Sequence, residues 1–219
     1  MNPIRDSPVS RNTTFRDESV REWMLEQWMG YDRDWFDRLW ALHSEGHRHY
    51  HTPMHLWEML QRETTGSKSV RLAIFFHDAI YDPRSSTNEV DSAELFRKFA
   101  ATSQQDVNVE EVAALILATQ HHVVSPDNSP TLAYFLDLDM AVLGKEREAY
   151  LHYASLVRKE YEFVPREVYC SKRVEVLEGF LEQPRIFGTE DYREALEERA
   201  RGNLRHEIDL LKRGIIPGE

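Results

Sequence analysis

His77 and Asp78 stand side by side inside 74-IFFHDAIYD-82, a run that is otherwise almost wholly apolar. Burying a charged side chain in apolar surroundings costs several kcal/mol unless a partner compensates the charge. On a helix the two side chains would lie about 100° apart and could border one cavity. Taken alone, this pair could be a core histidine bonded to a neighbouring acid. The positions of the chain's other histidines and acids are therefore needed to distinguish such a structural pair from a functional site.

Histidines and aspartates recur in three more apolar segments: His51 and His55 in 50-YHTPMHLWEML-60, His121 and His122 in 112-VAALILATQHHV-123, and Asp137 and Asp139 in 132-LAYFLDLDMAVLG-144. Imidazole and carboxylate are the ligands of borderline transition metals. A buried divalent cation would compensate the acids and would require neutral imidazoles. The recurrence in four separate segments therefore predicts a metal site rather than accidental polarity in the core.

The two aspartates of the last segment cannot both serve one ion. Residues two apart on a helix lie about 200° apart around its axis, so Asp137 and Asp139 face different sides. At most one of them is a direct ligand, and the spacing alone does not choose between them.

The order of these motifs, a histidine, then His-Asp, then a distant aspartate, resembles the HD superfamily of metal-dependent phosphohydrolases. More narrowly, RHYHTPMHLWEML, LAIFFHDAIYD, LILATQHH and FLDLDMAVLG resemble a bacterial and fungal family described as predicted HD-superfamily metal-dependent phosphohydrolases. The resemblance covers about residues 20–210. The motif YHTPMH, followed by HD, is also similar to the catalytic region of cyclic-nucleotide phosphodiesterases. In those enzymes the first histidine of Y-H-x-x-x-H is a proton donor and the second is a metal ligand.

The resemblance implies a metal set of four residues: His55, His77, Asp78 and Asp139. It favours Asp139 over Asp137 because the superfamily's last aspartate is often followed by an apolar and then a small residue, here Met140 and Ala141. Asp137 is the alternative for this position.

The resemblance also implies roles around that set. His51 matches the general acid, and His121 and His122 resemble the paired histidines that support a second metal in some dinuclear members. Asp78 would bridge the ions if two are present. The expected cofactor is one or two divalent transition-metal ions, of manganese, iron, zinc, nickel or cobalt, with magnesium as an alternative.

Four further residues are secondary candidates. Glu89 could hydrogen-bond a metal-bound water, although with Ser86 it also has the spacing of a helix capping box. Arg48, next to the YH motif, could contact a substrate phosphate or be a solvated charge. Lys172 and Arg173 could bind phosphate or belong to an exposed helix face.

Together these residues predict hydrolysis of a phosphate ester, of a nucleotide or another small phosphorylated compound, through metal-activated water. His51 would protonate the leaving oxygen. Tyr81 stands where phosphodiesterases commonly have another histidine, so specificity for cyclic nucleotides does not follow. Two alternatives stay open, a di-iron oxygenase with the HD fold and a non-catalytic metal-binding or ligand-sensing HD protein.

The elements that must position these residues are predicted to be helices, because apolar residues recur at helical spacing and strand-like alternation is nearly absent. The predicted helices cover about 20–28, 35–43, 53–63, 68–82, 87–100, 109–122, 130–143, 146–161, 165–182 and 189–213. Thr52 and Pro53 have the residue types of an N-cap and a first helical position. The predicted fold is all-α, an HD-domain bundle of roughly nine or ten helices. Residues 1–14 are expected to form a flexible tail, and 15–219 a single HD-type helical domain.

Composition limits the partners. The formal net charge of −11 argues against binding to nucleic-acid polymers or anionic membranes. No apolar run is long enough to span a membrane or to act as a signal peptide. The single cysteine, Cys170, excludes an internal disulfide. We therefore expect a cytoplasmic protein whose partner is a small phosphorylated substrate, and a homo-oligomer is compatible with the sequence.

Overall fold

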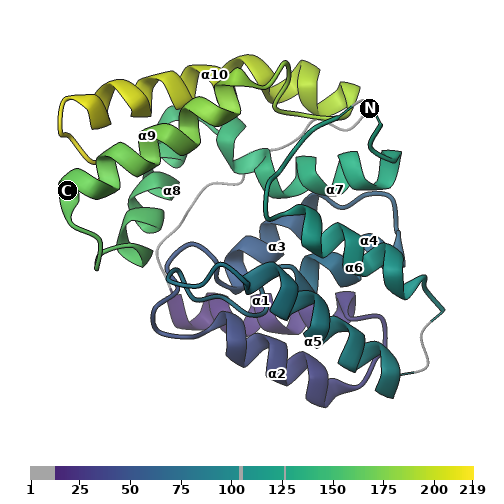
Figure 1. The fold of residues 1–219 in the computed structure, drawn as a ribbon. Coiled ribbons are helices and arrows are strands. Elements are labelled where there is room, and N and C mark those ends of the chain that lie inside the picture. The colour runs from purple at the N-terminus through teal and green to yellow at the C-terminus, as the bar shows by residue number, and fades with distance from the viewer. Residues whose placement is uncertain (1–12, 104–105, 126) are drawn as a thin grey trace. The chain divides into compact units, whose positions relative to one another are not determined.

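The computed structural model describes residues 13–103, 106–125 and 127–219 (Figure 1). These residues form ten α-helices and one 3-10 helix, and no strand occurs among them. The all-α prediction is therefore confirmed. The chain divides into two compact units, the first ending at His121 and the second beginning at His122. The single domain predicted over residues 15–219 stays a prediction.

The first unit contains six helices: α1 (Thr13–Gln27), α2 (Arg33–His43), α3 (Pro53–Arg62), α4 (Lys68–Phe76), α5 (Asn88–Thr102) and α6 (Val109–Ala118). Residues 1–12 of the predicted tail lie outside the described residues, and the last two residues of that tail already belong to α1. α4 is apolar all round, which predicts a central helix. It packs against α3, α5 and α6, and its side chains from Leu72 to Phe76 are all buried.

An aromatic core fixes α4 against its neighbours. The ring of Trp28, beyond the end of α1, lies 5.0 Å from that of Phe75 and 5.3 Å from that of Phe99, centroid to centroid. Phe76 and Phe99 are 5.1 Å apart. Buried aromatic pairs contribute about 0.5–1.5 kcal/mol each beyond the area they bury. The last turn of α4 is therefore held firmly just before His77 and Asp78.

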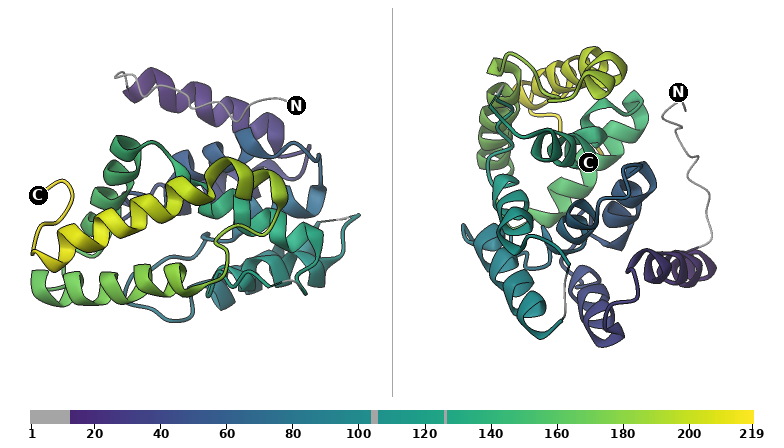
Figure 2. Two further views of the ribbon diagram at one scale, coloured as in Figure 1. Left: turned by 90° about the horizontal axis from the view of Figure 1, so that it is seen from above. Right: turned by 90° about the vertical axis from the view of Figure 1, so that its right-hand side faces the viewer.

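The second unit contains α7 (Pro130–Met140), the 3-10 helix η1 (Ala141–Gly144), α8 (Arg147–Glu160), α9 (Arg166–Glu182) and α10 (Glu190–Lys212). α9 and α10 lie side by side, as Figures 1 and 2 show. η1 also packs on α10, and a Cβ on Gly144 would lie only 2.6 Å from the Cβ of Leu196. A glycine is therefore needed where the two elements touch. Among the described residues, no helix has the length and apolar character needed to cross a membrane.

α4 is shorter than the sequence predicts, because it ends at Phe76 rather than near residue 82. His77 is its C-cap residue, and Asp78 follows in a turn. Partners outside the helix bind the backbone there. Ile80 donates its N–H to the Ser92 hydroxyl at 3.0 Å, and Arg48 donates to the Asp78 carbonyl at 2.7 Å. The prediction that His77 and Asp78 lie on the side of a continuing helix is therefore wrong.

Two other helix ends also differ from the prediction. The N-cap of α5 is Thr87, so Glu89 is the second helical residue and the predicted Ser86–Glu89 capping box is wrong. α6 ends at Ala118 rather than near residue 122, because the Thr119 hydroxyl and N–H both bind the Ile116 carbonyl and tighten the last turn. His121 and His122 therefore follow the helix instead of ending it.

Candidate metal centre

Two segments of the first unit carry the residues that come together. His55 lies in the first turn of α3, which begins as predicted, with Thr52 as N-cap and Pro53 as first residue. The His55 N–H donates to the Thr52 carbonyl at 3.0 Å, which fixes this turn. His77 and Asp78 come from the turn that ends α4. α3 and α4 pack against each other, so the two segments meet.

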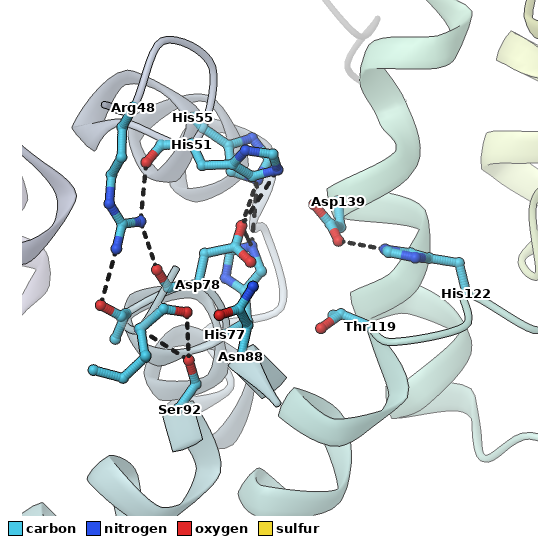
Figure 3. A network of polar contacts seen from close by, with 12 residues as sticks. Arg48, His51, His55, His77, Asp78, Asn88, Ser92, Thr119, His122 and Asp139 are labelled. Atoms are coloured by element: carbon cyan, nitrogen blue, oxygen red, sulfur yellow. Dashed lines mark hydrogen bonds and ion pairs between the residues drawn. The ribbon is translucent and has the colours of Figure 1, made fainter. Parts of the chain in front are cut away.

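Three of the four predicted metal ligands form one cluster. His55, His77 and Asp78 each offer a ligand atom within 4.8 Å of the other two, and among the described residues no other such group of three occurs. His55 and His77 are buried, and Asp78 is partly exposed. Figure 3 shows their polar ends converging on one point. A cluster of this composition suits a borderline divalent metal.

The distances agree with shared coordination. The Nε2 atoms of His55 and His77 are 3.3 Å apart. Asp78 Oδ2 lies 3.0 Å from Nε2 of His77 and 3.9 Å from Nε2 of His55. Two ligand atoms that are each about 2.1 Å from one ion are separated by about 3.0 Å at a right angle and about 3.4 Å at a tetrahedral angle. Two of the three separations lie in this range, and the third corresponds to a wider angle.

The hydrogen bond of the His77 ring shows how a cation would suit this cluster. His77 Nδ1 lies 2.9 Å from the Ile74 carbonyl, which can only accept, so Nδ1 carries a hydrogen. In the neutral ring, Nε2 then presents a lone pair to the carboxylate of Asp78. A proton on Nε2 could relieve one such contact, but the third atom, Nε2 of His55, faces the same point. A divalent ion satisfies all three atoms together, so the residues fit a metal.

His51 stands beside the cluster rather than in it. Its Nε2 is 4.0 Å from Asp78 Oδ2, too far for a hydrogen bond, and 23% of its side chain is exposed. Its ring packs between two tyrosines, 5.0 Å from Tyr50 and 4.3 Å from Tyr81, centroid to centroid. A held, partly exposed imidazole near the ligands is compatible with the predicted acid. Tyr81 therefore contacts His51 from the position where phosphodiesterases carry a histidine.

Arg48 binds the backbone of the residues that form this site. Its side chain is fully buried and binds two backbone segments, donating to the carbonyls of His51 at 3.2 Å, Asp78 at 2.7 Å and Ala79 at 3.1 Å. Its Nε also donates to the Glu45 carboxylate at 3.2 Å. These contacts differ from both expectations, because the guanidinium is neither solvated nor open to a phosphate. The sequence offered no local signal, since three of these contacts are to backbone oxygens.

The fourth predicted ligand lies in the second unit. Asp139 accepts a hydrogen bond from Nε2 of His122 at 2.7 Å, and His122 adopts the left-handed backbone region with φ of 47°. His121, the last residue of the first unit, is exposed. The participation of these three residues in a metal site stays a prediction.

Asp137, the alternative to Asp139, has a structural environment. Its carboxylate is buried and accepts from Gly188 N at 2.6 Å, Thr189 N at 2.8 Å and Thr189 Oγ1 at 2.6 Å. Burial raises the pKa of this carboxyl above its usual range, and these three donors oppose the shift. Asp137 therefore binds the residues that precede α10, and all of these donors belong to the second unit.

The remaining candidates, Lys172, Arg173 and Glu89, are not members of the group of His55, His77 and Asp78. Lys172 is mostly exposed and pairs with Glu175 at 2.8 Å. Arg173 is largely buried and pairs with Glu207 at 2.9 Å, so it does not lie on an exposed helix face. Glu89 lies in the first turn of α5, half-buried. Substrate contacts for Lys172 and Arg173, and a metal-water contact for Glu89, stay predictions.

One buried histidine was absent from the sequence-based candidates. His43 at the end of α2 is 1% exposed, its Nδ1 lies 2.9 Å from the Leu39 carbonyl, and its Nε2 has no hydrogen-bond partner. Burial, followed by the charge of Arg48, lowers its pKa to about 3. Its spacing from Phe36 and Leu39 on one helical face was the available signal for burial.

Comparison with known proteins adds no relative. No protein-family model, no curated protein and no solved structure matches the chain. The resemblance to the HD superfamily therefore rests on the sequence motifs alone and stays a prediction.

Proposed function

We propose that the protein is a metal-dependent phosphohydrolase that cleaves a phosphate ester of a nucleotide or another small phosphorylated compound. The observation that carries the proposal is the convergence of His55, His77 and Asp78, with His51 beside them. A predicted acid beside a group of proposed metal ligands is the combination that metal-dependent hydrolysis needs. The order of the sequence motifs supports the same class.

His55, His77 and Asp78 would hold a divalent ion, with Asp139 proposed as the fourth ligand. When bound, such an ion polarises a phosphoryl oxygen and brings the pKa of a water molecule toward neutrality. The protein's own contribution is to orient the imidazoles toward the site. The Ile74 carbonyl does this for His77, because it holds the ring hydrogen on Nδ1 and leaves Nε2 for the ligand site.

His51 would deliver a proton to the leaving oxygen. Tyr50 and Tyr81 restrict its ring, while its exposed fraction leaves an edge open to substrate. Its Nε2 lies 4.0 Å from Oδ2 of Asp78, beyond hydrogen-bonding distance of that oxygen. A positioned general acid of this kind contributes roughly 10²–10⁴-fold in rate.

The first test separates binding from catalysis. In His51→Ala we expect metal content, measured by plasma mass spectrometry, to match the wild type. Turnover of a generic phosphodiester or of the best substrate in a nucleotide panel should fall by roughly 10²–10⁴-fold. His206→Ala, which removes an exposed histidine of α10, is the matched control and should change neither quantity.

Three outcomes would contradict the proposal in different ways. Loss of metal in His51→Ala would make His51 a ligand rather than the acid. Oxygen uptake by the iron-loaded wild type, without phosphate release, would favour the oxygenase. If protein loaded with manganese, cobalt, nickel, zinc or magnesium hydrolysed no phosphodiester, phosphomonoester or nucleotide, the non-catalytic alternative would replace the phosphohydrolase.

A further inference from the structure

We propose that Arg48 is a positioning residue that sets the distance between the His51 segment and the Asp78 turn, and so determines metal affinity without touching metal or substrate. This inference rests on the metal site of the proposed function. It concerns one buried guanidinium and the two backbone segments it joins (Figure 3).

The contacts of Arg48 run to both segments at once. One nitrogen, Nη1, donates to the carbonyls of His51 and Asp78, residues that are far apart in sequence and adjacent at the site. Nη2 donates to the next carbonyl, that of Ala79, at 3.1 Å. A planar guanidinium presents its donors in a fixed fork, so three carbonyls bound to it are held at fixed separations.

These carbonyls belong to the site residues themselves or to their neighbours. The peptide groups of His51 and Asp78 carry the side chains whose polar atoms lie 4.0 Å apart. His55 follows His51 by one turn, and His77 precedes Asp78 directly. A shift of either segment would therefore move the acid and the ligands relative to each other.

Arg48 also contacts His51 indirectly, through the ring of Tyr81. The Arg48 guanidinium lies over Tyr81, 5.3 Å from the ring centroid, and Tyr81 packs on His51. Cation–π attraction of this kind stabilises a desolvated pair. Arg48 thus stabilises both the backbone of His51, by a hydrogen bond, and its imidazole ring, through Tyr81.

Among the described residues, the charge of Arg48 is not balanced by a buried carboxylate. Its side chain is fully buried, and its nearest carboxylate, Glu45 at 3.2 Å, is 40% exposed. A buried arginine that binds mainly backbone oxygens costs desolvation energy, and a leucine or methionine would fill the same space without that cost. Methionine, however, has no N–H donors and could not bind the three carbonyls that Arg48 holds.

The test uses Arg48→Lys and Arg48→Met, with Arg71→Met as a matched control. Arg71 forms a partly buried ion pair in the first unit, with Glu63 at 2.7 Å, but binds neither site segment. We expect the Kd for Co²⁺ or Mn²⁺, measured by calorimetry, to rise roughly 10- to 100-fold in both Arg48 variants. In Arg71→Met the thermal midpoint should fall while the Kd stays within twofold. Lysine keeps the charge but lacks the fork, so it should not rescue metal affinity.

A second readout uses the protein without metal. Long-range ¹H–¹⁵N spectra of the histidine rings should show shifted His51 and His77 signals in Arg48→Lys and unshifted ones in Arg71→Met. Unchanged Kd and ring signals in folded Arg48→Lys would overturn the inference. A raised KM with unchanged metal Kd would instead make Arg48 a substrate contact. If the wild type binds metal but hydrolyses nothing, the phosphohydrolase fails, while the Kd comparison still decides the role of Arg48.

Discussion

Asp78 and Asp137 are both aspartates in apolar segments, but their surroundings differ in kind. The carboxylate of Asp137 is bound by two N–H groups and a hydroxyl, all of them donors. The Asp78 carboxylate lies 3.0 Å from an imidazole nitrogen of His77, which in the neutral ring presents a lone pair rather than a hydrogen. Donors complete a structural carboxylate, whereas a cation would satisfy converging lone pairs. Burial alone does not distinguish the two aspartates in this way, because Asp137 is the more buried of the two.

The largest effect should come from Asp78→Asn. The amide keeps the size of the side chain but removes the charge and places an N–H₂ group beside the imidazoles. Since even the outer partners of metal ligands are worth about 10- to 100-fold in affinity, we expect metal affinity to fall by at least about 100-fold and hydrolysis to disappear. Calorimetry and metal analysis measure this. An Asp78→Asn protein that keeps its metal would place Asp78 with Asp137 as a structural residue.

The reciprocal change is Asp137→Asn. Asparagine has one acceptor oxygen, so it would leave either the part-buried N–H of Gly188 or that of Thr189 without its acceptor. We expect the free energy of unfolding, measured with urea, to fall by about 2–3 kcal/mol while metal affinity stays the same. Loss of metal without loss of stability would reverse the assignment and restore Asp137 as a ligand.

His43 supplies a third and smaller case, a buried polar group that stays neutral. Its pKa is lowered to about 3, against about 6.5 in the unfolded chain, so folding favours the uncharged ring. The resulting stability is complete above about pH 6.5 and is lost as the pH falls toward 3, because the unfolded chain binds the proton first. At about pH 5.5 the loss due to His43 should be about 1–1.5 kcal/mol.

The variant His43→Leu isolates this effect from the other histidines. Urea unfolding at several pH values should show a shallower acid slope in His43→Leu than in the wild type. Equal slopes would mean that His43 is protonated in the fold, and that a buried histidine here can carry charge without a metal or an acid beside it.

Much of the fold follows from local patterns. Helical spacing located all ten helices, and the Thr52–Pro53 pair marked the start of α3. Histidines and aspartates in apolar segments predicted a metal site, and the resemblance of the motif order to the HD superfamily selected the three residues that form the cluster, His55, His77 and Asp78.

The features that sequence reasoning missed depend on distant partners. α4 ends where it does because Arg48 and Ser92 bind the turn that follows it, and they lie 30 and 12 residues from their partners. The hydrogen bonds of the Asp137 carboxylate come from the backbone N–H groups of Gly188 and Thr189, 51 and 52 residues away. These long-range contacts could not be predicted from the local sequence, because they involve backbone N–H and C=O groups, which are the same at almost every residue.

The early end of α4 has an electrostatic consequence. Peptide dipoles of a helix add up to about half a negative charge at its C-terminus, an effect confined to the last turn. Because α4 stops at Phe76, His77 and Asp78 lie at that negative end instead of along the flank of a longer helix. The helix would therefore favour a cation beside His77 and Asp78, by about 0.3–1 kcal/mol at an exposed site and more where the site is partly buried. Through this field the backbone of α4 would stabilise an ion that none of its carbonyls needs to touch.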